Sequence, residues 1–168
     1  MEKSLVLTGM MGVGKSTIGK LLAKRLKVKF IDVDKIIERN EKKSIKLIFE
    51  DSGEKYFRKL EEKITLKIIK KKRSVIALGG GAFMNDDIRE KVLNSCISVW
   101  LKVSLNKLIR RYKNNNRRPL LNKKKLDMDV KKIYQLRKKI YSLANFKISC
   151  DNMNKTQIVE KILVLYEN

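Results

Sequence analysis

Glycine, lysine and serine residues near the amino terminus have the spacing of a phosphate-binding loop. Residues 4–8 form a short apolar run typical of a buried strand, and the chain that follows fits G-x-x-x-x-G-K-[ST] from Gly9 to Gly14, Lys15 and Ser16. Such glycines let backbone N–H groups converge on a phosphate at the positive end of a helix. Lys15 can then reach the β- and γ-phosphates of a nucleotide, and Ser16 a Mg²⁺ ion. The pattern predicts a P-loop; a glycine turn with an incidental lysine is the plainer alternative.

Two carboxylates follow the second predicted strand, at residues 29–33. Asp32 and Asp34 flank one residue at the carboxyl end of that strand, so we expect them to point to the same side. Ligands of open α/β sheets bind at this edge. Next to a P-loop, the pair favours a metal site. Alternatively, one of the two only caps a helix that starts near Lys35.

An arginine with acidic neighbours begins the long helix predicted at residues 53–71. Glu54 and Arg58 lie in its first turn, and Glu61 follows one turn later, so Glu61 can hold the guanidinium in place. An exposed ion pair without consequence is the alternative.

Three glycines, at positions 79–81, end the third predicted strand, at residues 74–78. A flexible turn needs only one glycine, so three indicate close approach of a ligand or of another backbone segment.

The remaining elements alternate between strand and helix. Strands are further predicted at residues 97–102, where Trp100 belongs to the core, and at residues 146–150. Helices are predicted at residues 14–26, from about 35, and at 44–51, 86–93, 105–112, 127–143 and 156–166. Five strands alternating with helices predict an α/β fold, with a parallel sheet covered by helices on both faces.

The stretch from Lys113 to Asn122 has no periodicity and carries Arg117 and Arg118, so we predict a mobile loop there. The chain of 168 residues has the length of one domain. Within it, we expect a substrate-binding helical segment at about residues 33–62 and a mobile lid at about 113–125.

The composition is strongly basic. Lysine and arginine number 41 against 18 acidic residues, a formal charge of +23, but the lysines are spread along the whole chain. We attribute most of this charge to compositional drift, which leaves a field that attracts anionic substrates and a nonspecific affinity for polyanions. The absence of histidine removes His-based catalysis, and Cys96 and Cys150 fit no metal or redox spacing. No signal peptide or membrane span is recognisable, so we expect a cytoplasmic protein.

Taken together, the motifs resemble the shikimate kinase family in order and spacing. They are G-M-M-G-V-G-K-S-T, Asp32-x-Asp34, Gly53-Glu54-x-x-Phe57-Arg58, the triple glycine and Arg118-Pro119-Leu120-Leu121. The resemblance covers essentially the full chain. It implies the strand order 2-3-1-4-5 and transfer of the ATP γ-phosphoryl group to the 3-hydroxyl of shikimate, which gives shikimate 3-phosphate for chorismate and aromatic amino acid biosynthesis. From the sequence we further expect a monomer without a specific nucleic-acid or membrane partner.

The resemblance also implies roles for individual residues. Lys15, Asp34 and Arg118 would be catalytic, and Ser16 and Asp32 would bind Mg²⁺. Residues implied for ATP binding are Gly12, Val13, Gly14, Lys15, Ser16, Thr17, Arg111 and Arg118. Residues implied for shikimate binding are Asp34, Phe49, Phe57, Arg58, Glu61, Gly80, Gly81 and Arg137.

Three other interpretations remain open at this stage. The first is another small-molecule kinase of the same fold, acting on gluconate or a nucleoside monophosphate. The second is a nucleic-acid-binding protein, suggested by the charge, although the chain lacks interleaved exposed aromatic residues and a recognition motif. The third is an inactive homologue, which the presence of all the motif residues disfavours.

Overall fold

The fold was taken from a computed structural model, which describes residues 3–113 and 126–167. Its strands are β1 (Ser4–Thr8), β2 (Lys29–Asp32), β3 (Ser74–Ala77), β4 (Cys96–Lys102) and β5 (Phe146–Ser149). Its helices are α1 (Lys15–Leu26), α2 (Val33–Glu41), α3 (Ile45–Ile69), α4 (Asp86–Ser95), α5 (Leu105–Lys113), α6 (Leu126–Tyr141), α7 (Lys155–Glu167) and the 3₁₀ turn η1 (Ala82–Met84).

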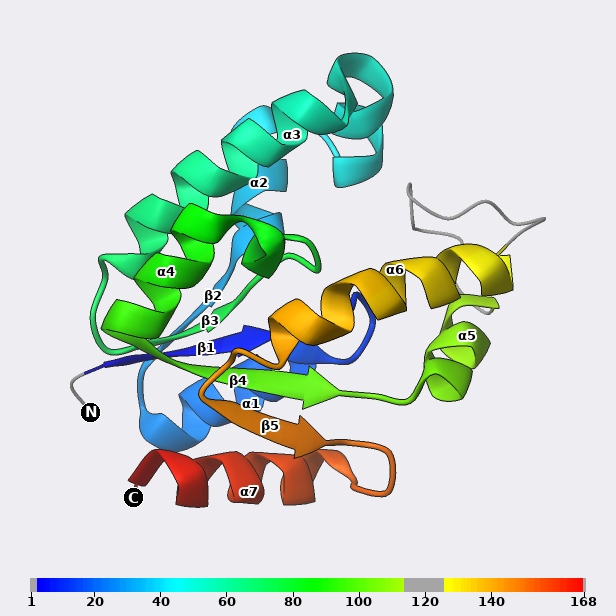
Figure 1. The fold of residues 1–168 in the computed structure, drawn as a ribbon. Helices are drawn as coiled ribbons and strands as arrows, with labels where there is room; N and C mark the ends of the chain where they lie inside the picture. Colours follow the sequence, from blue (N-terminus) through cyan, green and yellow to red (C-terminus); the bar gives the residue numbers. More distant parts are fainter. Residues whose placement is uncertain (1–2, 114–125, 168) are drawn as a thin grey trace.

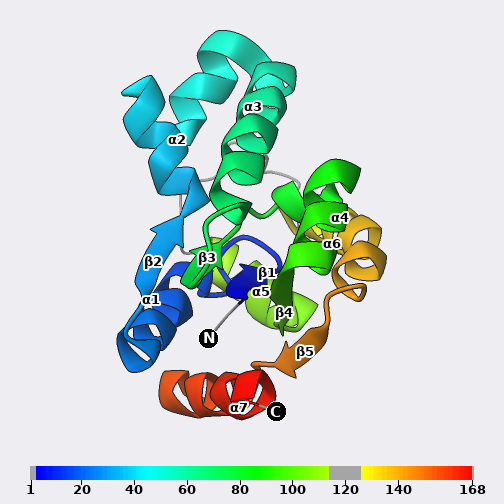
Figure 2. The ribbon, with the colours of Figure 1, turned by 90° about the vertical axis from the view of Figure 1, so that its left-hand side faces the viewer.

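The strands form one parallel sheet, as the alternating pattern predicted, in the order β2-β3-β1-β4-β5 that the family resemblance implied. Helices α1 and α7 lie on one side of the sheet, and α4 lies on the other with the end of α3 (Figures 1 and 2). Helix α2 and the first half of α3 project from this body. In such a sheet the carboxyl ends of all strands lie at one edge, so the loops that follow β1, β2 and β3 meet there.

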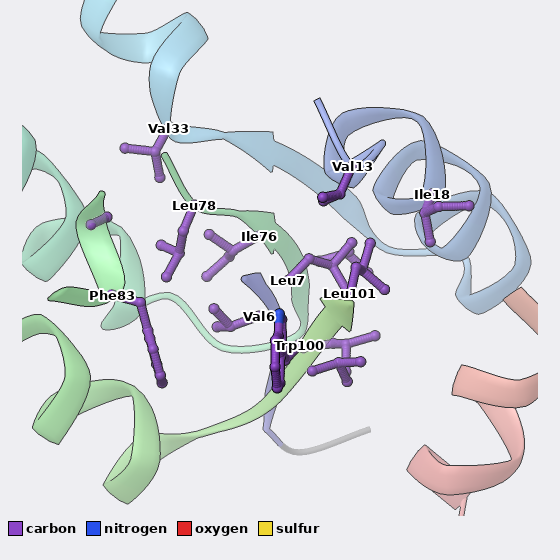
Figure 3. Close-up of a cluster of buried hydrophobic side chains, with 14 of the residues drawn as sticks. Val6, Leu7, Val13, Ile18, Val33, Ile76, Leu78, Phe83, Trp100 and Leu101 are labelled. Carbon is purple, nitrogen blue, oxygen red and sulfur yellow. The ribbon is translucent and has the colours of Figure 1, made fainter. Parts of the chain in front are cut away.

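The central strands supply the core. Leu5, Val6 and Leu7 of β1 are fully buried, as are Val75 and Ile76 of β3. Strands buried on both faces read as continuous apolar runs, which is why the sequence located them well. Figure 3 shows part of this core, where Trp100 lies next to β1. Trp100 is 3% exposed, and the predicted core position is confirmed. Cys96 and Cys150 are buried free thiols.

Several predicted boundaries differ from the structure by one or two residues, and two of these differences concern strands that lead to the site. Strand β2 ends at Asp32, and Val33 already belongs to α2, so Asp34 lies in the first turn of a helix and not at the end of a strand. The reason is the cap: the Asp32 side chain accepts a hydrogen bond from the Lys35 backbone N–H at 3.3 Å, which starts the helix one residue later. Leu78 likewise lies beyond β3.

The two helices predicted on either side of Ser52 form a single element, α3, that is kinked at Gly53. Gly53 has φ 79° and ψ 170°, a non-helical conformation that favours glycine. The kink separates the segment that carries Phe49 from the one that carries Phe57 and Arg58. No helix in the described part of the chain is both long and apolar enough to cross a membrane.

Candidate active site

The P-loop connects β1 to α1 at the carboxyl edge of the sheet. Gly12 and Gly14 have φ values of 71° and 103°, in the region that favours glycine, and Gly14 precedes the first residue of α1. Gly14, the N-cap residue, has no side chain with which to cap this helix. The N–H groups of its first turn therefore stay available for an anion, at the end of the helix where the dipole is positive.

Lys15 lies inside the P-loop. Its side chain is largely buried, and the Nζ atom donates hydrogen bonds to the carbonyl oxygens of Gly9 at 2.8 Å and Met10 at 3.0 Å. The ammonium group is thus held beneath the loop backbone, where it can turn to a phosphate that the loop binds.

Ser16 and Asp32 meet beside the P-loop. The Ser16 hydroxyl donates to Oδ2 of Asp32 at 2.6 Å, while Oδ1 of the same carboxylate caps α2. The helix-cap interpretation of Asp32 is therefore confirmed through Oδ1, while a metal role for Oδ2 stays a prediction. A hydroxyl and one carboxylate fit Mg²⁺, which keeps several waters and takes its other ligands from substrate phosphates. Among the described residues no cluster of three acidic or sulfur ligands exists that would suit a protein-only metal cage.

Helix α5 holds the other side of the P-loop. The Tyr112 hydroxyl donates to the Met11 carbonyl oxygen at 2.6 Å, and Arg111 Nη1 donates to the Gly12 carbonyl oxygen at 3.0 Å. Arg111 also lines a cavity of about 630 Å³ together with Val13, Gly14 and Thr17 of the P-loop region. Residues 153–156 close its far side. This cavity has the size and position for the nucleoside part of a nucleotide whose phosphates enter the loop.

Two carboxylates face the backbone of Gly79, across from the P-loop. A Cβ atom at Gly79 would lie 2.3 Å from Oε1 of Glu61 and 2.7 Å from Oδ1 of Asp34. Both oxygens are buried and have no hydrogen-bond partner among the described residues. Such orphaned acceptors are costly, and they fit a ligand that brings hydroxyl donors.

Electrostatics connect these carboxylates with the P-loop. The pKa of Asp34 is raised from 3.8 to about 7, chiefly by burial and next by the Glu61 carboxylate, while the Lys15 ammonium acts to lower it. Burial also raises the pKa of Glu61, against the lowering effects of Arg58, Arg137 and Lys15. Lys15 therefore acts on both carboxylates, so the phosphate loop and the acidic pair form one site.

We expect Gly79→Ala to damage this site directly. The added methyl group would push into two carboxylate oxygens and displace Asp34, so we predict that kcat/KM for the acceptor falls by about 10- to 100-fold. Gly19→Ala is the matched control, because its methyl group would meet the ring of Phe30 at 2.4 Å, away from the carboxylates. The control should lower the melting temperature without a selective effect on acceptor KM. Equal kinetic losses in the two variants would contradict the role of Gly79.

Arg58 lies at the mouth of the acidic pair. Its Nη1 donates to Oε2 of Glu61 at 2.6 Å, and its Nη2 donates to Oε1 of Glu54 at 3.0 Å. The guanidinium carbon is 5.2 Å from the ring centroid of Phe57 and 6.0 Å from that of Phe49. A guanidinium fixed between carboxylates and aromatic faces is preorganised to bind a carboxylate. The predicted contact between Arg58 and Glu61 is confirmed. The ion pair is partly buried, in contrast to the alternative of an exposed ion pair.

Glycine at position 81 makes this placement of Arg58 possible. A Cβ atom there would lie 2.4 Å from Nη1 of Arg58. The triple glycine thus serves close approach, but the groups that approach Gly79 and Gly81 are carboxylate and guanidinium side chains, not the ligand or backbone segment that the sequence analysis expected. Gly80 packs against the P-loop, where its Cβ would meet the Met11 nitrogen at 3.1 Å.

Helix α6 reaches the same turn through Arg137. Its Nη1 donates to the Gly80 carbonyl oxygen at 2.9 Å, and the Tyr141 hydroxyl donates to the same oxygen. The structure therefore brings Arg137 to the site. Tyr141 was missed by sequence reasoning, although its spacing of four residues from Arg137 places both on one helix face. Its ring lies 5.9 Å from that of Trp100, and burial raises the pKa of Tyr141 to about 12, so it stays a hydrogen-bond donor.

Phe49 and Phe57 pack against each other with ring centroids 4.7 Å apart. Arg118 and all of the predicted lid except Lys113 lie within residues 114–125, outside the described residues. The roles predicted for Phe49, Phe57, Arg118 and the lid stay predictions.

A parallel sheet in this strand order, with a P-loop facing buried carboxylates and a fixed arginine, defines a small-molecule kinase of the P-loop class. The family model "Shikimate kinase" matches residues 11–167. The chain belongs to the shikimate kinase family.

Relatives and solved structures agree with this assignment. The chain is 44% identical to the shikimate kinase of Sulfurihydrogenibium sp. over 96% of both chains, and 38% identical to that of Persephonella marina over 96% of this chain and 97% of the relative. Its fold superposes on the shikimate kinase of Acinetobacter baumannii in complex with shikimate, with a TM-score of 0.93, 31% identity and coverage of 98% and 93% of the two chains.

Proposed function

We propose that this protein is a shikimate kinase, which transfers the γ-phosphoryl group of ATP to the 3-hydroxyl of shikimate and forms shikimate 3-phosphate. The observation that carries the proposal is the Arg58 guanidinium, which Glu54 and Glu61 hold beside Gly81 at the mouth of the acidic pair. A hydroxylated ring acid needs a fixed guanidinium for its carboxylate and acceptors for its hydroxyls.

On the nucleotide side, the P-loop amides and Lys15 bind the β- and γ-phosphates in this proposal. Ser16 and Asp32 hold the Mg²⁺ ion of Mg·ATP, which supplies neutralisation of phosphate charge. Arg111 lies against the nucleoside part in the cavity that it lines with Val13 and Thr17.

On the acceptor side, Asp34 accepts hydrogen bonds from the shikimate hydroxyls and takes the proton of the attacking hydroxyl late in the transfer. Arg58 and Arg137 bind the carboxylate together with the amides of Gly80 and Gly81, and Phe49 and Phe57 wall the ring. Glu61 orients Arg58. Phosphoryl transfer through a loose transition state needs little more than such positioning and charge, to which Arg118 of the predicted lid contributes.

A coupled assay of ADP release tests the acceptor. We expect ATP turnover with shikimate and none above background with gluconate or nucleoside monophosphates. Phosphorylation of gluconate or of a nucleotide at a comparable kcat/KM would support the first alternative instead. Absence of turnover with every acceptor would support an inactive homologue. A monomeric cytoplasmic enzyme is part of this proposal.

The raised pKa of Asp34 predicts a pH dependence of acceptor binding. Only the ionised carboxylate accepts hydrogen bonds with both oxygens, so the affinity of the nucleotide-free protein for shikimate should fall by about tenfold per pH unit below about pH 7. Calorimetry in buffers of different ionisation enthalpy should detect proton release on binding at pH 6. Asp34→Asn should bind more weakly and lose this pH dependence. A constant affinity between about pH 5 and pH 8, on both sides of the Asp34 pKa, would contradict the prediction.

The raised pKa of Asp34 also affects stability, but in the opposite direction: stability falls as the pH rises. Asp34 has a folded-state pKa above its usual 3.8, so its contribution is most favourable below pH 4 and is lost as the pH rises towards 7. The ligand-free protein should therefore gain stability at neutral pH from Asp34→Asn, which chemical denaturation can measure.

A further inference from the structure

A second cavity, of about 810 Å³, lies at the amino edge of the sheet. It is formed where α1 leads into β2 and where α3 leads into β3, on the side opposite the arrowheads of the strands (Figure 1). Its lining contains five cationic residues, Lys27, Lys29, Lys71, Lys72 and Arg73. Leu26, Val28 and Ile31 add apolar surface, and Ser74 completes the lining.

Strand pairing assembles the cations from two distant segments. Lys29 is the register partner of Ser74, so residues 27–29 lie beside residues 71–74. All five cationic side chains are exposed, and none forms an ion pair with an acidic side chain in the described ranges 3–113 and 126–167. None of the described residues that line the cavity carries a carboxylate. Part of the positive charge that the sequence analysis attributed to compositional drift is therefore concentrated around this cavity.

Helix ends do not account for this cluster. Cations at the carboxyl end of a helix offset its dipole, but the last turn of α1 already carries Lys24 and Arg25, and that of α3 carries Lys67. The cluster is also separate from the kinase site, because the P-loop, Asp34 and the triple glycine all follow the opposite ends of the strands.

We propose that this cavity binds a small anion with two or three linked phosphate groups. Lysines supply compact charges and Arg73 a planar fork, the two kinds of donor that phosphates accept from proteins. A chain of two or three phosphates carries a comparable charge of opposite sign. The volume is in the range of small-ligand sites, and the apolar residues suit an apolar group attached to the phosphates.

A single-stranded nucleic acid fits this cavity less well. Sequence-tolerant binding of such strands uses aromatic side chains on which the bases stack, and none of the lining residues is aromatic. The hollow is also bounded on both sides by cations, which favours a ligand of limited length over one that extends along the surface.

Calorimetry with inorganic tripolyphosphate at about 0.15 M salt tests the proposal. No nucleotide is added, because ADP has two linked phosphates and would compete for the cavity. We expect the wild type to bind two equivalents of tripolyphosphate, one in the P-loop and one in the cavity. The triple variant Lys29→Gln, Lys71→Gln, Lys72→Gln should bind the second equivalent at least about tenfold more weakly, since three exposed charge contacts are lost.

The matched control carries Lys20→Gln, Lys147→Gln and Lys161→Gln. These lysines are exposed, lie outside the cavity, and change the net charge by the same amount. The control should bind like the wild type. Equal weakening in both variants would show a general charge effect and overturn the proposal, as would binding of no more than one equivalent by the wild type.

Two further measurements keep the outcome decisive. Tripolyphosphate should protect Lys29, Lys71 and Lys72 of the wild type from acetylation more than Lys20, Lys147 and Lys161, which requires no variant. Uniform protection would overturn the proposal. A single-stranded oligonucleotide should bind more weakly than tripolyphosphate; tighter binding that the cavity variant abolishes would make this surface a nucleic-acid site instead.

Discussion

Replacing Lys15 with alanine is expected to reduce kcat for phosphoryl transfer by about 10³-fold or more. In the proposed mechanism the loop holds this ammonium group next to the β- and γ-phosphates, where its charge stabilises the transferring group. Its removal takes away charge stabilisation that no other described residue of the loop can supply.

The fold should survive this substitution. The P-loop keeps the hydrogen bonds from Tyr112 to Met11 and from Arg111 to Gly12, which do not involve Lys15. Circular dichroism and the melting temperature should stay close to those of the wild type. Lys20→Ala, an exposed position on the same helix, is the control and should retain full turnover. A Lys15→Ala variant with the wild-type rate would remove the P-loop from the mechanism.

Periodicity and motif spacing located most of this fold. The central strands are continuous apolar runs between turn signals, so the strand order followed from one parallel sheet and the family resemblance. The P-loop, the contact between Arg58 and Glu61, and the need for close approach at the triple glycine were all predicted. In each case the signal is local, because the chemistry depends on residues a few positions apart.

The features that were not predicted from the sequence depend on contacts between segments that are far apart in the chain. Nothing near Gly79 in the sequence indicates that Asp34 and Glu61 meet its backbone, 45 and 18 residues away. Tyr141 likewise acts on Gly80, across 61 residues. The boundary error at Asp34 has a different cause: a capping aspartate and a strand-end aspartate look alike in sequence, and only the hydrogen bond to Lys35 distinguishes them.

Arg58→Ala is expected to have the second large effect, and it should act on one substrate. In the proposed function the Arg58 guanidinium binds the shikimate carboxylate, and a charge-assisted hydrogen bond contributes about 1.5–3 kcal/mol. We therefore predict that KM for shikimate rises by roughly 10- to 150-fold, with KM for ATP nearly unchanged. Steady-state kinetics with each substrate varied in turn measures this difference.

The same substitution should also cost stability, because it leaves a buried acid behind. The side chain of Glu61 is 3% exposed and that of Arg58 is 29% exposed. Breaking a fully buried pair costs about 3–5 kcal/mol, and partial exposure of the arginine lowers the expected loss to roughly 2–3 kcal/mol. Glu54→Gln, which removes the exposed partner of Arg58, should cost less than about 1 kcal/mol.

A double variant separates the two effects. Arg58→Ala with Glu61→Gln removes the uncompensated charge, so the free energy of unfolding should recover in part, while KM for shikimate should stay as high as in the single variant. Binding and stability then depend on different atoms of one ion pair: the guanidinium binds the acceptor, and Glu61 orients the guanidinium at the cost of burying a carboxylate. If the double variant regained shikimate affinity along with stability, Arg58 would be a structural residue only, and Arg137 would remain as the predicted partner of the carboxylate.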